Sequence, residues 1–169
     1  MSSLDAGSSL QLRDPVNLVC RRAIWYWTVR ALGCWLAIWA VEILVLVETH
    51  GDRTVPWIVL AVSVLLGVAH VLVMPQWRFR VHRWEATGTA VYTRSGWFNQ
   101  ERRIAPLSRI QTVDTERGPL EQLFRLSNVT VTTASAAGPV KIHGLSRTEA
   151  DRLVAELTVI TAAGTGDAT

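Results

Sequence analysis

The sequence is poor in charge and in cysteine, and each shortage excludes a class of protein. Charged residues make up only 18% of the 169 residues, whereas an average soluble domain has about 25% and a disordered chain needs high charge and low hydrophobicity. Cys20 and Cys34 are the only cysteines, so a disulfide-stapled scaffold is excluded. Lysine occurs once, and the other sixteen of the seventeen basic residues are arginine.

Patterns typical of catalysis and of metal binding are also missing. None of the four histidines has a cysteine or a carboxylate at the spacing typical of metal ligands; they are His50, His70, His82 and His143. The chain has no Gly-x-Ser-x-Gly motif, no phosphate-binding glycine loop and no nucleotide fingerprint. We therefore predict that the protein is not an enzyme and that it has no catalytic residue, no cofactor and no metal site.

Two long apolar stretches occupy the first half of the chain. Val55–Met74 holds twenty residues without a formal charge, and a helix of that length covers the roughly 30 Å hydrocarbon core of a bilayer. Trp27–Val47 is similarly long but carries Arg30 and Glu42. Arg30 follows an aromatic cluster typical of the membrane interface, from which its side chain can reach the headgroups. The short polar segment 48–54 predicts a turn, so the two spans form an antiparallel hairpin.

Basic residues on either side of the spans predict the orientation of this hairpin. Three arginines precede the first span, three follow the second, and one lies in the turn: Arg13, Arg21 and Arg22, then Arg78, Arg80 and Arg83, against Arg53. Short loops rich in basic residues stay in the cytoplasm. We therefore expect a multi-pass protein of the inner (plasma) membrane with both termini in the cytoplasm.

A few polar and small residues inside the spans are candidate contacts between helices. Glu42 lies five residues from the outer end of its span, where it either extends toward the interface or accepts a hydrogen bond from a partner helix. Gly33 and Ala37 lie at about the same depth as Gly67 and Ser63. These small residues either allow close packing of helices or merely reflect the frequency of small residues in membrane spans.

Beyond Gln76 the pattern is that of a soluble α+β domain. Alternating apolar residues between turn residues predict strands over 89–93, 97–104, 109–116, 129–133 and 140–142. The spacing of Leu120, Leu123 and Phe124 predicts a short helix between the third and fourth strands. The segment 146–149 (SRTE) is a capping box, and it opens an amphipathic helix that reaches Ile160.

The chain thus divides into a cytoplasmic N-terminal segment (1–22), a transmembrane helical hairpin (23–75), a cytoplasmic domain (76–160) and a flexible tail (161–169). The domain has its own apolar strands and a capped helix. We therefore expect it to fold without the hairpin, although its core is small.

Four stretches of this domain resemble the bacterial pleckstrin-homology-like (PH-like) membrane proteins of the YdbS type: Ile104–Val113, Gly118–Leu126, Val129–Ala134 and Ile142–Leu145. The resemblance extends over roughly residues 21–157. It implies two membrane spans followed by a PH-like fold, in which a curved antiparallel sheet is closed by the last helix, and it implies no established activity. The sequence departs from the family at Phe124 and Arg125, where members often have a Leu-Gly pair.

Five arginines are candidate contacts with an anionic cytoplasmic leaflet: Arg78, Arg80, Arg83, Arg102 and Arg103. Each basic residue near such a surface gains about 1 kcal/mol, although the topology alone also accounts for the first three. The first hairpin loop, 86–88, has no basic residue, whereas eukaryotic PH domains that read phosphoinositides cluster basic residues there. Aromatic residues do not interleave with the arginines, which argues against nucleic-acid binding.

These observations predict a non-catalytic, membrane-anchored PH-like interaction module that acts within an inner-membrane protein assembly. The alternative is a domain that binds or senses anionic lipid at the cytoplasmic leaflet. The expected partners are membrane lipids and another membrane protein, either a related PH-like protein or a second copy of this chain.

Overall fold

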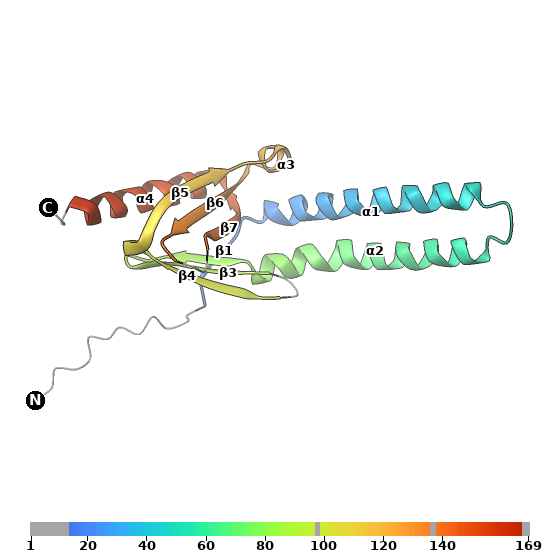
Figure 1. Ribbon diagram of the computed structural model, residues 1–169, viewed down its shortest axis with the longest axis horizontal. Coiled ribbons are helices and arrows are strands. Elements are labelled where there is room, and N and C mark those ends of the chain that lie inside the picture. The colour runs from blue at the N-terminus through green and yellow to red at the C-terminus, as the bar shows by residue number, and fades with distance from the viewer. Residues whose placement is uncertain (1–13, 97–98, 136–137, 167–169) are drawn as a thin grey trace, which may run out of the picture.

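Two long helices lie side by side and project from one end of a smaller body of strands and helices (Figure 1). This computed structural model describes residues 14–96, 99–135 and 138–166. The helices are α1, Arg22–Glu48, and α2, Thr54–Val81, and both are long and apolar enough to cross a membrane. Their large apolar side chains, such as Leu36, Leu65 and Leu72, are exposed. A continuous apolar surface of this extent is suited to lipid rather than to water.

The second helix is longer than the sequence predicts. α2 continues through Pro75 to Val81, past the expected end of the hairpin at residue 75. The sequence prediction placed that end where the apolar residues stop, and a helix can continue beyond its apolar part. The turn between α1 and α2 is confirmed. There the carboxylate of Asp52 accepts a hydrogen bond from the backbone N–H of Thr54 at 2.9 Å, which satisfies one of the free donors at the start of α2.

Over the residues that the structure describes, seven strands form two antiparallel sheets. The first sheet has the order β1-β2-β3-β4, with β1 Asn17–Leu18, β2 Arg83–Ala86, β3 Ala90–Ser95 and β4 Glu101–Pro106. The second has the order β5-β6-β7, with β5 Ile110–Glu116, β6 Leu126–Thr133 and β7 Val140–Ser146. The connecting elements are the short 3₁₀ helix η1, Leu107–Arg109, and α3, Pro119–Leu123, and the last element is α4, Arg147–Gly166.

The five predicted strands correspond to β3 through β7, and the predicted short helix corresponds to α3. Parts of four predicted segments lie outside the described residues: 1–13 of the N-terminal segment, 97–98 of the second predicted strand, 136–137 of the turn before β7 and 167–169 of the tail. The α+β class, with antiparallel sheets followed by a C-terminal helix, is confirmed.

The capping box at the start of α4 is confirmed atom by atom. The hydroxyl of Ser146 accepts from the backbone N–H of Glu149 at 3.2 Å, and the carboxylate of Glu149 accepts from the backbone N–H of Ser146 at 3.0 Å. The backbone stays helical to Gly166, six residues past the predicted end at Ile160.

The core of the domain lies between the sheets and α4. Leu126 and Leu145 from the second sheet, and Leu153 from α4, are almost completely buried. Trp27 and Ala23, at the start of α1, belong to the same buried cluster. The core therefore draws side chains from outside residues 76–160, and the expectation that this segment folds alone has to be revised.

Candidate functional site at the junction of hairpin and sheets

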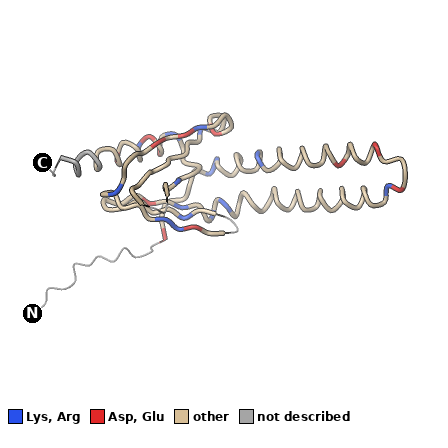
Figure 2. The backbone as a smooth tube through the Cα atoms, viewed as in Figure 1, with Lys and Arg blue, Asp and Glu red and all other residues tan. Residues whose placement is uncertain are grey.

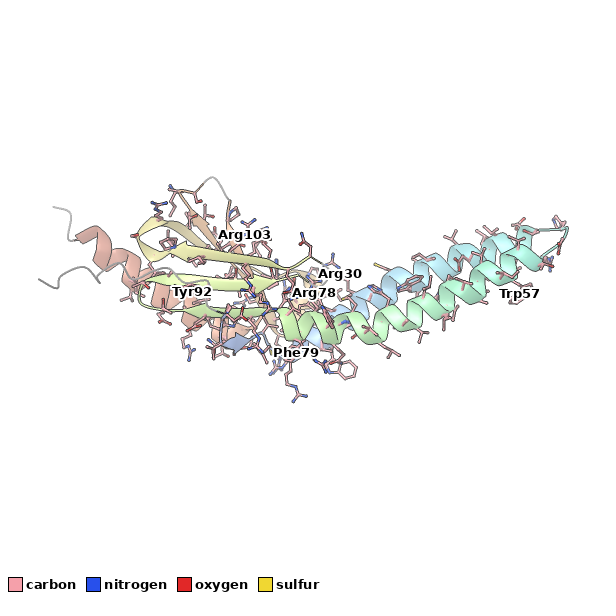
Figure 3. All side chains as sticks on the ribbon, turned by 90° about the horizontal axis from the view of Figure 1, so that it is seen from below. Arg30, Trp57, Arg78, Phe79, Tyr92 and Arg103 are labelled. Atoms are coloured by element: carbon pink, nitrogen blue, oxygen red, sulfur yellow. The ribbon has the colours of Figure 1, made fainter. Side chains whose placement is uncertain are left out.

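The hairpin and the sheets meet at a buried tryptophan. Because α1 and α2 are antiparallel, the first turns of α1 pack against the last turn of α2, and only 2% of the surface of Trp27 is exposed. The guanidinium carbon of Arg78 lies 4.8 Å from the ring centroid of Trp27, a cation–π distance. Figure 3 shows Arg30 and Arg78 at this junction and Trp57 near the opposite end of the hairpin.

His82, the residue after α2, packs against the same tryptophan, with the two ring centroids 5.2 Å apart. Its Nδ1 lies 2.8 Å from the carbonyl oxygen of Arg78, and because a carbonyl can only accept, Nδ1 carries the proton. Burial, followed by the positive charge of Arg78, lowers the pKa of His82 to about 4. Burial and the same arginine also lower the pKa of His143 on β7. Both rings are therefore neutral at pH 7.

A polar network ties α3 to the hairpin. The hydroxyl of Tyr26 on α1 donates to the carboxylate of Glu121 on α3 at 3.1 Å, and the amide of Asn128 on β6 donates to it at 2.8 Å. Burial raises the pKa of Glu121, but the hydrogen bonds from Asn128, Gly118 and Tyr26 together lower it by more than burial raises it. The pKa of Glu121 therefore lies below its ordinary value. The carboxylate is thus ionised and fixed at neutral pH.

Gly144 on β7 lets the chain before α1 come close to the second sheet. Its φ is +79°, in the left-handed region that favours glycine, and an added Cβ would lie 3.0 Å from the Cβ of Ala23. The carbonyl of Gly144 accepts from the backbone N–H of Cys20 at 2.9 Å. The start of α1 is therefore packed against the sheet and hydrogen-bonded to it.

Beside this network lies a cavity of about 860 Å³ with arginines from four separate segments in its wall. The lining residues are Arg22, Arg117, Gln122, Arg125, Leu126, Ser146, Arg147 and Thr148. We call this the arginine cavity. Nothing in the sequence spacing indicates it, because its arginines lie far apart in the chain and the fold alone brings them together.

The five arginines predicted to contact the leaflet come from three elements, α2, β2 and β4. Arg78 is packed against Trp27, and Arg80 and Arg83 lie on α2 and β2. Arg102 on β4 forms an ion pair with Asp14 at 3.1 Å. Its neighbour Arg103, labelled on the sheet in Figure 3, pairs with Glu101 and also donates to the carbonyl of Pro139.

Within the hairpin, the hydroxyl of Ser63 donates to the carboxylate of Glu42 at 2.5 Å. Of the two alternatives for Glu42, extension toward the interface or a hydrogen bond from a partner helix, neither anticipates this donor, which comes from α2 of the same chain. Gly67 is buried, and a Cβ there would lie 2.6 Å from Trp39. Gly33 and Ala37 are exposed on the hairpin surface, so they do not pack against Ser63 and Gly67.

Among the described residues, no group of three or more His, Cys, Asp or Glu side chains is placed to hold a metal ion. Figure 2 shows Lys, Arg, Asp and Glu concentrated on the strand-rich end and at the turn of the hairpin, with few between. The arginine side chains that line the cavity can each donate paired hydrogen bonds.

Fold and junction together define a PH-like sheet domain carried on two apolar helices. Residues 24–158 match the family described as Bacterial PH domain, and the chain belongs to that family. It is 37% identical over 93 residues to the UPF0699 transmembrane protein YdbS of Bacillus subtilis (strain 168), an alignment that covers 55% of this chain and 57% of that relative's length. No solved structure matches the chain. These findings place the protein in a membrane.

Proposed function

We propose that the protein is a non-catalytic, membrane-anchored module that holds its PH-like domain against the anionic cytoplasmic leaflet. The observation that carries this proposal is the position of α3. This helix lies beside the first turns of α1 (Figure 1), where Tyr26 hydrogen-bonds Glu121. Leu123, at the end of α3, is 73% exposed. A short helix with exposed leucines at the level of an interfacial aromatic cluster is suited to the boundary between headgroups and acyl chains.

The charge distribution supports the same orientation. Arginines flank both spans on the domain side, and the turn of the hairpin has only Arg53, so the positive-inside rule predicts that the hairpin spans twice with both termini in the cytoplasm. The anionic surface of that leaflet attracts nearby basic residues. The first hairpin loop, 87–89, lies at the end of β2 away from α2, so the contact with lipid is assigned to α3 and its surroundings instead.

The experiment measures the depth of α3. In a background that lacks Cys20 and Cys34, Leu123→Cys carries a fluorophore, and the full-length protein is placed in nanodiscs with brominated acyl chains. We expect strong quenching at position 123 and little at Gly88→Cys, the matched control in the first hairpin loop. Equal, weak quenching at both positions would overturn the proposal.

A second candidate function is contact with another membrane protein through α1. Gly33 and Ala37 are exposed on the hairpin, where small residues allow close approach of a second helix. The partner would be a related PH-like protein or a second copy of this chain. For a second copy, Ala37→Cys without the native cysteines should form a disulfide-linked dimer in membranes on mild oxidation. The control Ile38→Cys, also exposed and one residue further along α1 on a different side of the helix, should not. Equal cross-linking at both positions would count against a specific face.

A further inference from the structure

The arginine cavity carries more positive charge than its surroundings neutralise. Asp151 is the carboxylate that approaches it, 3.0 Å from Arg117 and 3.8 Å from Arg147. Within the part of the chain that the structure describes, Arg22 and Arg125 form no ion pair, and both are exposed at the cavity wall. Unpaired guanidinium groups that converge on one space attract an anion, and the planar guanidinium binds phosphate through two parallel hydrogen bonds.

Nearby carboxylates are engaged elsewhere. Glu149 accepts the hydrogen bonds of the capping box at Ser146, and Glu121 accepts those of Tyr26 and Asn128. Thr148, in the first turn of α4, also lines the cavity. The positive end of the dipole of this long helix therefore faces the same space, which adds to the attraction for a negative group.

The backbone at Arg125 is a second, independent observation. Its φ is +53°, and it is the one non-glycine residue with positive φ among the described residues. A residue with a side chain is disfavoured in this conformation relative to glycine. Arg125 follows Phe124, the C-cap of α3, and its side chain lines the cavity. Helices commonly end in this conformation at a glycine, so an arginine here, at a cavity wall, points to a use for its side chain.

We propose that the arginine cavity binds the phosphate of an anionic lipid headgroup. This inference rests on the proposed function, because the source of the phosphate follows from position. Arg22 is the first residue of α1 and Gln122 belongs to α3, so the cavity opens between the two elements that the proposed function places at the leaflet. A volume of about 860 Å³ lies within the range of small-molecule sites and accommodates a phosphodiester headgroup.

The test uses full-length protein in mild detergent and native mass spectrometry to measure bound short-chain phosphatidylglycerol, with short-chain phosphatidylcholine and inorganic phosphate as parallel probes. We expect saturable binding of phosphatidylglycerol in preference to phosphatidylcholine. Arg125→Gly should weaken it about tenfold or more, because a charge-assisted contact is lost, while thermal stability does not fall. Arg22→Gln should also weaken it. The matched control Arg109→Gln, which removes an exposed charge outside the cavity, should leave binding unchanged.

Equal affinity in the Arg125→Gly and Arg109→Gln proteins would overturn the site, as would equal binding of both lipids. Tighter binding of inorganic phosphate than of phosphatidylglycerol would retain the phosphate chemistry and overturn the lipid as its source. The depth measurement at Leu123 separates the two proposals. If Arg125→Gly binds phosphatidylglycerol as wild type does, the phosphate site is overturned. If the fluorophore at position 123 is still quenched in that same protein, docking of α3 on the leaflet stands.

Discussion

A neutral histidine buried against a tryptophan and an arginine couples the stability of this protein to pH. The folded state holds the pKa of His82 at about 4, whereas an unfolded chain gives histidine its ordinary value near 6.5. Between these two values the unfolded state binds more protons than the folded state, so stability falls as pH drops from 6.5 toward 4. The pKa of His143 is shifted in the same direction.

The first prediction follows from this linkage. Lowering the pH from 7.5 to 5 should cost about 2 kcal/mol through His82 alone. His82→Gln cannot titrate and should lose that part of the pH dependence, whereas His50→Gln, in the exposed turn of the hairpin, should retain it. Thermal unfolding of the full-length protein in nanodiscs across this pH range measures the difference. Parallel curves for wild type and His82→Gln would contradict the burial of this ring.

At the scale of elements, the glycine of each membrane span, Gly33 in α1 and Gly67 in α2, should respond differently to substitution by alanine. A Cβ on Gly67 would lie 2.6 Å from Trp39 and 2.9 Å from Trp35, whereas a Cβ on Gly33 meets nothing within 4 Å. Gly67→Ala should therefore destabilise the hairpin by about 1–3 kcal/mol through overpacking, and Gly33→Ala should change it by less than about 0.5 kcal/mol. Unfolding in mixed micelles measures both. A harmless Gly67→Ala would mean that the helices pack differently.

The elements that could be predicted from the sequence are those specified by local pattern. The two spans are predicted from length and apolar composition alone. The start of α4 is indicated by the capping box at Ser146. β1 and β2 were not predicted. β1 is only two residues long, Asn17–Leu18, and it is defined by its pairing with β2 far along the chain, at Trp84 and Arg83. The pairing of Glu42 with Ser63 was also missed, since the rotation of one helix against the other is a tertiary property.

At the scale of the whole molecule, the hairpin and the sheets share one core. A fragment of residues 76–169 lacks Val19, Ala23 and Trp27, which belong to that core. We expect this fragment to unfold without cooperativity. A chain in which a short linker joins residues 14–27 directly to 76–169 should fold, because Trp27 lies next to Arg78. Circular dichroism during thermal unfolding compares the two, and a cooperative transition in the shorter fragment would contradict the shared core.

The candidate site could be predicted only in its general position. The run of arginines after the second span predicts the side of the membrane, but of the five arginines named for lipid contact, Arg102 and Arg103 form ion pairs and Arg78 packs on Trp27. Arg22 and Arg125, which line the arginine cavity, are brought together by the junction of α1 with the second sheet. Sequence separation hides such a cluster, because it exists only after the hairpin has packed on the domain.

The central claim is that the PH-like domain lies on the cytoplasmic leaflet, and the side of the membrane tests it most directly. A reporter enzyme that is active only in the cytoplasm is fused after Thr169 or inserted in the turn between Gly51 and Asp52. The excess of arginines on the domain side predicts activity after Thr169 and silence in the turn. Activity in the turn with silence after Thr169 would contradict the orientation, the leaflet contact of α3 and the lipid assigned to the arginine cavity.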